Sequence, residues 1–202
     1  IRTIENFRLT GDRVHRIEAN VSGTIAYLFN HYLPGTTFAG IVRTAQDSGY
    51  TEPDPRDDLN GLDFRRKMLI LAREIGLEAE LEQVGMDPIL PQDCLEAPSI
   101  EAFYERLAAA EGHFAAMRDE AAEQGKVLRC IGVCEPVDGG AGARMAVELK
   151  AVGPEHPFYA LTGSENIVAV TTDRYLESPL VIRGPGAGAK VTAAGVFSDL
   201  MR

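Results

Sequence analysis

The alternation of apolar and polar residues along the chain predicts a series of short elements. Residues 13–21 alternate loosely, which is typical of a strand. In the next segment apolar residues recur at helical spacing, and Ser22 stands where a helix N-cap is expected. We therefore expect a helix over 23–33, ended by Pro34-Gly35, and a second helix over 37–48.

Residues 50–58 contain two prolines separated by one residue, and this pattern excludes a helix there. A third helix is predicted over 59–75. It begins after Asp57 and Asp58, whose negative charge suits the positive end of a helix dipole. Its run Met68–Leu71 is apolar nearly all round, so we expect most of this helix to be buried.

The second half of the chain is predicted to contain most of the strands. Residues 99–124 form either an amphipathic helical hairpin or one interrupted helix. Residues 127–134 and 145–152 are predicted to form two hairpin strands around a glycine-rich loop at 138–142. Two more strands at 166–172 and 179–183, a glycine loop at 184–188 and a last helix at 190–201 follow. Helices that precede strands with mostly antiparallel connections predict an α+β fold in one domain.

Composition narrows the classes of function. The chain has 202 residues and a formal net charge of −10, which argues against a nucleic-acid partner because phosphate binding needs a basic surface. No stretch approaches the roughly 18 uninterrupted apolar residues of a membrane span, so no membrane partner is predicted. The chain opens on Ile without a Met, and from this we expect a fragment of a longer protein.

The three cysteines match neither a disulfide framework nor a zinc-binding spacing. Cys130 and Cys134 would lie on one face of a strand, where we expect them to pack as small apolar groups. Cys94 stands alone. Free thiols in a chain without a signal peptide favour a reducing compartment, and we expect the cytoplasm.

The densest group of chemically active side chains lies between Glu52 and Lys67. Asp63 and Lys67 are four residues apart on a predicted helix and therefore within reach of each other. One interpretation is an ordinary surface ion pair. The other is a partly buried lysine that a neighbouring carboxylate tunes as a proton donor.

The second candidate is the glycine loop of residues 184–189. It lacks the glycine spacing of a dinucleotide fingerprint and the Gly-Lys-Ser/Thr of a P-loop. It is either a tight turn from strand to helix or a loop whose backbone touches a phosphate or an aromatic cofactor. The histidines, at positions 15, 31, 113 and 156, have no ligand spacing, and no metal site is predicted.

The run from Gly49 to Asp63, followed by Arg66-Lys67, resembles the signature of homoserine dehydrogenases, most of all the dehydrogenase half of the bifunctional aspartokinase–homoserine dehydrogenases. Other motifs of the family follow in the family's order: Ser22–Thr24, Lys126–Arg129, His156–Phe158, Gly163–Ile167, Gly186–Ala189 and Val191–Val196. The resemblance implies reduction of aspartate 4-semialdehyde to homoserine with NADH or NADPH, in the biosynthesis of threonine and methionine.

The resemblance also implies the roles of individual residues. Lys67 would donate a proton to the carbonyl oxygen, and Asp63 would orient Lys67. Glu52 would hold the substrate ammonium group. The remaining residues would line the substrate pocket or approach the nicotinamide cofactor: Tyr50, Asp58, Gly23 and Thr24 for the substrate, Gly186 and Gly188 for the cofactor.

For the fold, the resemblance implies a mixed sheet covered by helices, the substrate-binding and dimerisation domain of a two-domain dehydrogenase. The nucleotide-binding Rossmann domain of the family is absent from 1–202, and segment 184–202 would pack toward it. The chain would form a homodimer through its sheet and would be inactive alone. Phe64-Arg65 departs from the smaller pair expected there.

Two alternatives remain open at this point. The chain could be a non-catalytic amino-acid-binding or dimerisation module that has kept this fold, or a dehydrogenase of the same architecture that acts on a different aldehyde. The choice between NADH and NADPH, the presence of an aspartokinase domain and regulation by threonine are left open.

Overall fold

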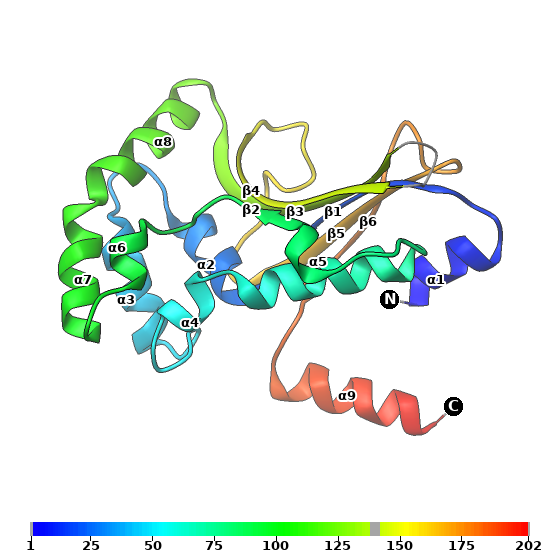
Figure 1. Cartoon of the computed structure of the whole chain (residues 1–202), viewed down its shortest axis with the longest axis horizontal. Helices are drawn as coiled ribbons and strands as arrows, with labels where there is room; N and C mark the ends of the chain where they lie inside the picture. The colour runs from blue at the N-terminus through cyan, green and yellow to red at the C-terminus, as the bar shows by residue number, and fades with distance from the viewer. Residues whose placement is uncertain (1, 138–141, 202) are drawn as a thin grey trace.

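The computed structural model describes residues 2–137 and 142–201 and arranges them on a six-stranded sheet (Figure 1). The strand order is β2-β4-β3-β1-β5-β6. Neighbouring strands are antiparallel except β2, which runs parallel to β4, so the sheet is mixed as expected. The strands are β1 (Val14–Asn20), β2 (Val84–Met86), β3 (Val127–Val137), β4 (Gly142–Val152), β5 (Glu165–Thr172) and β6 (Leu180–Pro185).

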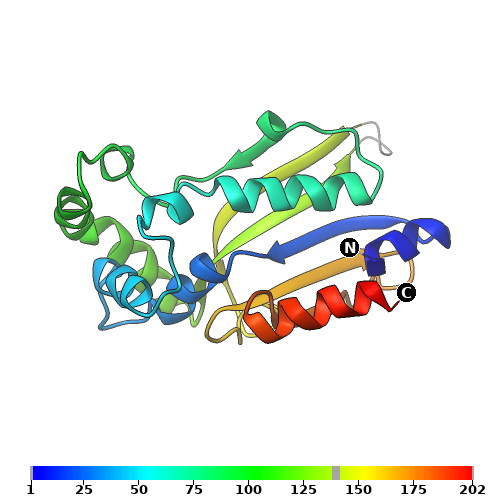
Figure 2. The ribbon, with the colours of Figure 1, turned by 90° about the horizontal axis from the view of Figure 1, so that it is seen from below.

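Helices cover one face of the sheet and one end of it (Figures 1 and 2). Helix α5 crosses the half of the sheet that contains β3 and β4. The other helices of the first half gather with α7 and α8 at one end of the molecule, whereas α1 lies at the opposite end. The helices are α1 (Arg2–Leu9), α2 (Gly23–His31), α3 (Phe38–Asp47), α4 (Arg56–Leu59), α5 (Leu62–Glu74), α6 (Gln92–Leu95), α7 (Ile100–Ala109), α8 (Glu111–Glu123) and α9 (Ala189–Leu200), with a 3₁₀ turn at Leu81–Gln83.

The main hydrophobic core lies between the sheet and these helices. Cys130 and Cys134 are buried in it from one face of β3, which confirms that they pack as small apolar groups, and Cys94 is also buried there. Burial raises the pKa of the Cys134 thiol to about 12, so this thiol stays protonated at neutral pH. No helix in the described ranges is long and apolar enough to cross a membrane.

The opposite face of the sheet, called the outer face below, is covered by the connection of residues 153–164 rather than by a helix. A smaller apolar cluster around Phe158 lies under this connection. Beyond the cluster, the outer face carries a network of ion pairs within single strands and between neighbouring strands: Arg16–Glu18, Arg144–Glu148 and Lys150–Glu148 within a strand, Arg16–Glu135 and Arg144–Glu135 between strands.

Several predicted elements are confirmed. The Ser22 hydroxyl accepts a hydrogen bond from the backbone N–H of Ile25 and caps α2, and Thr37 caps α3 in the same way. The segment 99–124 is an interrupted helix, because Ala110 alone separates α7 from α8. The pattern of apolar residues did not indicate α1, α6 or β2.

The prediction that residues 50–58 contain no helix was wrong at its end, because α4 begins at Arg56, directly after Pro55. A proline is compatible with the start of a helix, where its missing N–H would have no partner. The predicted helix 59–75 was also too long. Gly61 has φ of +70°, which ends the first helical turn before α5 starts at Leu62.

Helix α5 is less buried than its composition suggested. Phe64, Met68 and Leu71 face the core, but Ile70 is 49% exposed. The glycine loop is shorter than predicted, because β6 continues through Gly184 and Pro185. Residues 138–141 of the predicted hairpin loop lie outside the described residues.

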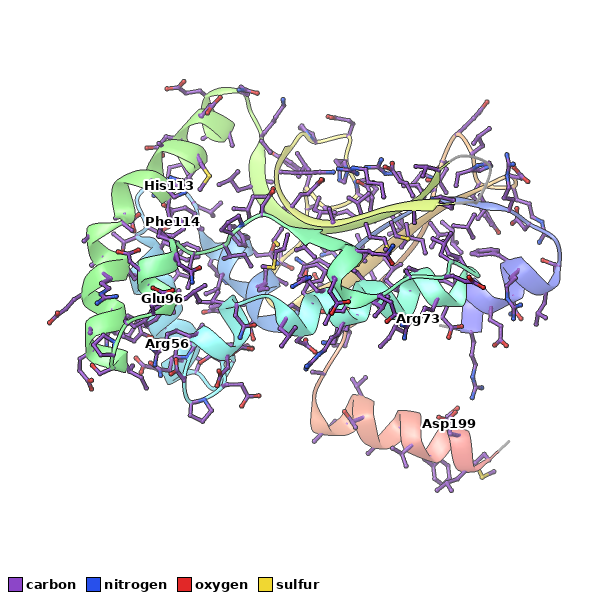
Figure 3. The ribbon with its side chains drawn as sticks, in the orientation of Figure 1. Arg56, Arg73, Glu96, His113, Phe114 and Asp199 are labelled. Carbon is purple, nitrogen blue, oxygen red and sulfur yellow. The ribbon has the colours of Figure 1, made fainter. Side chains whose placement is uncertain are left out.

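Helix α9 follows the glycine loop and stands below the half of the sheet that contains β5 and β6 (Figures 1 and 2). None of its residues is buried. An ion pair between Arg2 and Asp199, with 2.7 Å between the guanidinium nitrogen and the carboxylate oxygen, connects it to α1 (Figure 3).

Candidate active site

The predicted contact between Asp63 and Lys67 is present on α5. The Lys67 Nζ lies 2.7 Å from Asp63 Oδ2. The same Nζ donates a hydrogen bond of 3.0 Å to the backbone oxygen of Val21, at the end of β1. Because a backbone group 46 residues away fixes the ammonium group, this pair is more than a mobile surface ion pair. The Lys67 side chain is still 43% exposed, so a molecule from solution can reach it.

The N-terminus of α2 organises the second group of predicted residues. The Thr24 Oγ1 lies 2.7 Å from the backbone oxygen of Tyr50 and 2.9 Å from Asp58 Oδ1. The other carboxylate oxygen, Asp58 Oδ2, accepts a hydrogen bond of 2.8 Å from the backbone N–H of Glu52. Asp58 therefore ties segment 50–52 to α2, and both of its oxygens already have partners within the chain.

Two side chains of this segment remain available to a ligand. The Tyr50 ring stacks on Tyr27 of α2 with 4.5 Å between ring centroids, yet Tyr50 is 45% exposed. The Glu52 side chain is exposed, and its carboxylate has no hydrogen-bond or ion-pair partner among residues 2–137 and 142–201. A free carboxylate beside an exposed aromatic ring can bind a cationic group.

The strand register connects the glycine loop with the strand end that Lys67 contacts. In the antiparallel register of β1 and β5, Asn20 pairs with Ile167, so Val21 comes opposite Asn166. Asn166 also pairs with Gly184 of β6. A Cβ built on Gly186 would lie 1.8 Å from Asn166 Nδ2, so a side chain there would displace Asn166.

The glycine loop suits a flat cofactor that needs close approach to the backbone. Gly188 has φ of +120°, a conformation that residues with side chains rarely adopt, and it precedes the first turn of α9. Asn166 Oδ1 is buried without a hydrogen-bond partner among the described residues. Both observations fit a nicotinamide cofactor at this loop, since its carboxamide would supply a donor.

Sequence reasoning missed Arg129, which positions the wall of the site. This arginine is 3% exposed and donates hydrogen bonds of 2.8–3.0 Å to the backbone oxygens of Phe29, Leu128, Phe158 and Tyr159. Burial lowers its pKa to about 10, which leaves it charged at neutral pH. In the sequence, Arg129 ends the family motif Lys126–Arg129 and is the single arginine of an otherwise apolar strand, but neither signal indicated its role.

Through these bonds Arg129 fixes the connection 153–164 against α2. Asn30 of α2 adds a hydrogen bond of 2.9 Å from its Nδ2 to the backbone oxygen of Gly163. A Cβ on Gly23 would lie 3.8 Å from the backbone oxygen of Ser164, so the two segments are in contact at the start of α2. The structure thus gathers the candidate residues around Val21–Thr24: Lys67 and Asp63 on one side, Tyr50, Glu52 and Asp58 on another, and the glycine loop across β5.

Comparison with known proteins gives a consistent assignment. A family model described as "Homoserine dehydrogenase" matches residues 1–201. The chain is 45% identical over 202 residues to the chloroplastic bifunctional aspartokinase/homoserine dehydrogenase 2 of Arabidopsis thaliana, covering 100% of this chain and 22% of that protein. It is 41% identical over 208 residues to the homoserine dehydrogenase of Schizosaccharomyces pombe, covering 100% of this chain and 54% of that protein.

Solved structures share the fold. A crystal structure of a Candida auris protein of unknown function matches with a TM-score of 0.91 and 38% identity, over 99% of this chain and 56% of that one. A homoserine dehydrogenase from Thiobacillus denitrificans matches with a TM-score of 0.75 and 24% identity, over 99% of this chain and 42% of that one, which supports the fold alone.

These matches have a common feature. The chain spans 54% of the yeast relative and 22% of the plant relative, so it corresponds to part of each. The family match extends over nearly every residue, including all the candidate site residues. The chain therefore belongs to the homoserine dehydrogenase family.

Proposed function

We propose that this chain is the substrate-binding and catalytic part of an enzyme that reduces L-aspartate 4-semialdehyde to L-homoserine with NADH or NADPH. The observation that carries the proposal is the Lys67 ammonium group, held between Asp63 and the backbone oxygen of Val21 and still accessible. Membership of the family and the names of its relatives support this reaction.

The substrate is an amino acid whose ammonium group needs an anionic partner. Glu52 supplies an exposed, unpaired carboxylate, and Asp58 holds the Glu52 backbone in place through its N–H. Tyr50, Gly23 and Thr24 form the adjoining wall. Because Asp58 already accepts two hydrogen bonds, its main role is to position segment 50–52, and Glu52 makes the direct contact.

The chemical step requires a proton at the aldehyde oxygen. A nicotinamide cofactor held at the glycine loop of Gly186 and Gly188 would supply the hydride for the carbonyl carbon, whose C=O double bond would become a single bond. Lys67 Nζ donates the proton that converts the developing alkoxide into the homoserine hydroxyl. Asp63 orients Lys67 and stabilises its charge, and the exposed lysine takes up a new proton from water.

The cofactor would approach the glycine loop, with Gly186 and Gly188 in contact with the nicotinamide. Asn166 Oδ1, which has no partner among the described residues, and the positive φ of Gly188 support this placement. Helix α9, which has no buried residue, supports the idea that segment 184–202 packs against a nucleotide-binding domain. Without that domain the chain would lack the main cofactor site and would be inactive.

The outer face supports dimerisation through the sheet. No helix covers it in the described part of the chain, and Val181 of β6 is 40% exposed there. We expect sedimentation analysis to show a homodimer and Val181→Asp to shift it toward monomer. A wild-type chain that sediments as a monomer at all accessible concentrations would contradict this assignment.

Three unpaired, buried cysteines support a reducing compartment, and we infer the cytoplasm. The names of the plant relatives place those proteins in the chloroplast. A fluorescent fusion of the full-length protein, viewed in its own cells, distinguishes the two locations.

The direct experiment is an assay of the full-length protein for NADPH and NADH oxidation with aspartate 4-semialdehyde and with other short aldehydes. We expect turnover with the semialdehyde and none from the 202-residue chain alone.

Glu52→Gln should raise KM for the semialdehyde about tenfold or more, because a charge-assisted contact is lost, and should leave cofactor affinity unchanged. Asp93→Asn on α6, away from the site, is the matched control.

Calorimetry with homoserine tests the non-catalytic alternative. An enzyme of the proposed kind should bind homoserine more tightly in the presence of nicotinamide nucleotide. A simple amino-acid-binding module would bind it tightly with no dependence on the nucleotide and would show no turnover.

A further inference from the structure

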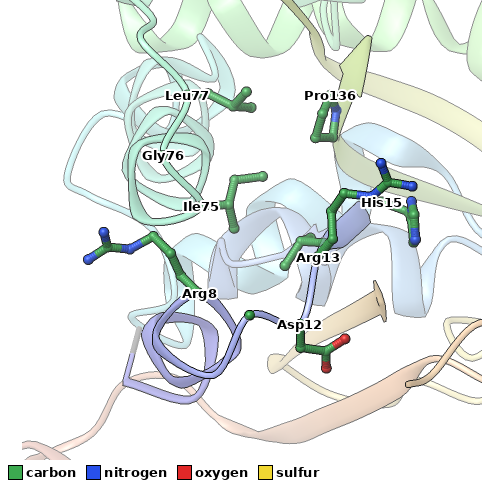
Figure 4. Close-up of a pocket in the computed structure, with 10 residues that line it drawn as sticks. Arg8, Asp12, Arg13, His15, Ile75, Gly76, Leu77 and Pro136 are labelled. Carbon is green, nitrogen blue, oxygen red and sulfur yellow. The ribbon is translucent and has the colours of Figure 1, made fainter. Parts of the chain in front are cut away.

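A cavity of about 540 Å³ lies at the end of the molecule opposite α7 and α8, and the proposed reaction does not use it (Figure 4). It is bounded by the end of α1, the start of β1 and the residues that follow α5. Ile75 lies eight residues beyond Lys67, which is about 12 Å along a helix axis. The cavity is therefore separate from the candidate active site, and its size suits a small molecule.

The rim of this cavity is positively charged although the chain as a whole carries −10. Arg8 and Arg13 are both exposed on it. Neither guanidinium group has an ion-pair or side-chain hydrogen-bond partner among residues 2–137 and 142–201. Figure 4 shows the two head groups on opposite sides of the opening, that of Arg13 beside His15. Two arginines without partners are a ready-made site for an anion.

The two nearby carboxylates each have a partner of their own, although the charge of Arg13 also acts on Asp173. Asp12 is 4% exposed, accepts a 3.0 Å hydrogen bond from the Thr172 hydroxyl and lies 3.5 Å from the Arg174 guanidinium. Asp173 is bound by His15, with 2.6 Å between His15 Nε2 and Asp173 Oδ1. The hydrogen bond from His15 keeps the pKa of Asp173 below its usual range.

The floor of the cavity is apolar. Val14 and Leu77 are buried beneath it, and Ile75 and Pro136 form its half-buried sides. A bare inorganic ion would leave these surfaces in contact with water. A ligand with a short hydrocarbon body would cover them and gain hydrophobic free energy.

We propose that this cavity binds a small carboxylate with a short apolar body. The carboxylate contacts the guanidinium group of Arg13 at the rim, Arg8 adds positive charge from the opposite side of the opening, and the apolar body lies on Val14 and Leu77. This inference does not depend on the proposed dehydrogenase reaction.

Nuclear magnetic resonance of the ¹⁵N-labelled 202-residue chain tests the site with a set of matched probes. Hexanoate carries the charge and the hydrocarbon body, 1-hexanol lacks the charge, hexylammonium reverses it, and inorganic phosphate lacks the body. We expect hexanoate to shift the amide signals of Gly11, Gly76 and Leu77 in a saturable way, with Kd on the order of 1 mM. The other three probes should bind at least tenfold more weakly.

Charge-removing variants identify the residues responsible. Arg13→Gln should weaken hexanoate binding about tenfold and Arg8→Gln about threefold, and the unperturbed remainder of each spectrum shows that the variant is folded. Arg43→Gln on α3, where the guanidinium lies over the Tyr104 ring, is the control and should bind hexanoate normally. Equal binding of hexylammonium, shifts that do not saturate, or wild-type affinity in both rim variants would overturn the proposal.

Discussion

Gly132 illustrates how a single residue sets the distance between the sheet and the helix that carries Lys67. A Cβ at this position would lie 2.3 Å from Met68 Sδ and 2.9 Å from the Phe64 ring, both on α5. We expect Gly132→Ala to lower the free energy of unfolding by about 1–3 kcal/mol, because the core must move to admit a methyl group. Urea unfolding measures this change.

Gly112 on α8 provides the matched control for that substitution, since nothing lies within 4 Å of the Cβ it would gain. Gly112→Ala should raise the free energy of unfolding by about 0.5–1 kcal/mol, because alanine is the better helix former. Similar effects of the two substitutions would show that α5 does not pack on β3 as described.

Glu18 on the outer face should make stability depend on pH. Burial alone would raise its pKa, but the nearby His156, whose Nε2 lies 3.6 Å from Glu18 Oε2, and the hydrogen bond from Arg16 outweigh burial and lower the pKa from 4.5 to about 2. The stabilisation is therefore complete above pH 4.5, where the unfolded carboxyl is ionised, and is lost as the pH falls toward 2.

Urea unfolding at pH 5 and pH 3 measures this effect. Between pH 5 and pH 3 the free energy of unfolding of the wild type should fall by about 1 kcal/mol more than that of Glu18→Gln, after allowance for screening by solvent. Equal falls in the two proteins would show that Glu18 is not paired in the folded state.

At the residue scale, the sequence predicted contacts that depend on local spacing. The pair of Asp63 and Lys67 was predictable because residues four apart on a helix are neighbours. The bond from Lys67 to Val21 was not, since it joins a side chain to a backbone oxygen 46 residues away. The same holds for Arg129, whose partners come from α2 and from the connection 153–164.

At the scale of elements, strongly periodic helices were predictable and short pieces were not. Ser22 and Thr37 marked the starts of α2 and α3 correctly. The three residues of β2 form a strand only because they pair with β4, a tertiary contact that no local pattern reveals. Similarly, Gly61 divides α4 from α5 through a positive φ that the apolar pattern did not indicate.

Helix α9 should contribute little to the stability of this chain, because none of its residues is buried. Ending the chain after Gly188 should leave the Tm within about 2 °C of the original value, as measured by circular dichroism.

Helix α1 is the control for this truncation, since it buries Ile4 and Phe7. Removing residues 1–11 should lower the Tm by about 8 °C or more. A comparable fall in Tm on removal of α9 would contradict the proposal that α9 packs against a surface outside this chain.

At the scale of the whole molecule, the fold places three groups at one end of the central strands. Lys67 of α5, segment 50–52 and the glycine loop all meet β1, α2 or β5 near Val21. The sequence predicted the α+β class, and its long motif indicated the candidate residues that the fold places here. The sequence could not predict that the Asp58 carboxylate accepts hydrogen bonds from the Thr24 hydroxyl and the Glu52 backbone N–H, because that arrangement depends on how α2 and α4 pack.

The central claim is that Lys67 donates the proton in the proposed reduction, and Lys67→Ala in the full-length protein tests it most directly. We expect kcat to fall about 10³-fold, while Kd for homoserine, measured by calorimetry, changes less than about threefold. Arg73→Ala, at the far end of the same helix (Figure 3), should keep normal turnover. A Lys67→Ala enzyme with kcat within tenfold of wild type would contradict the account.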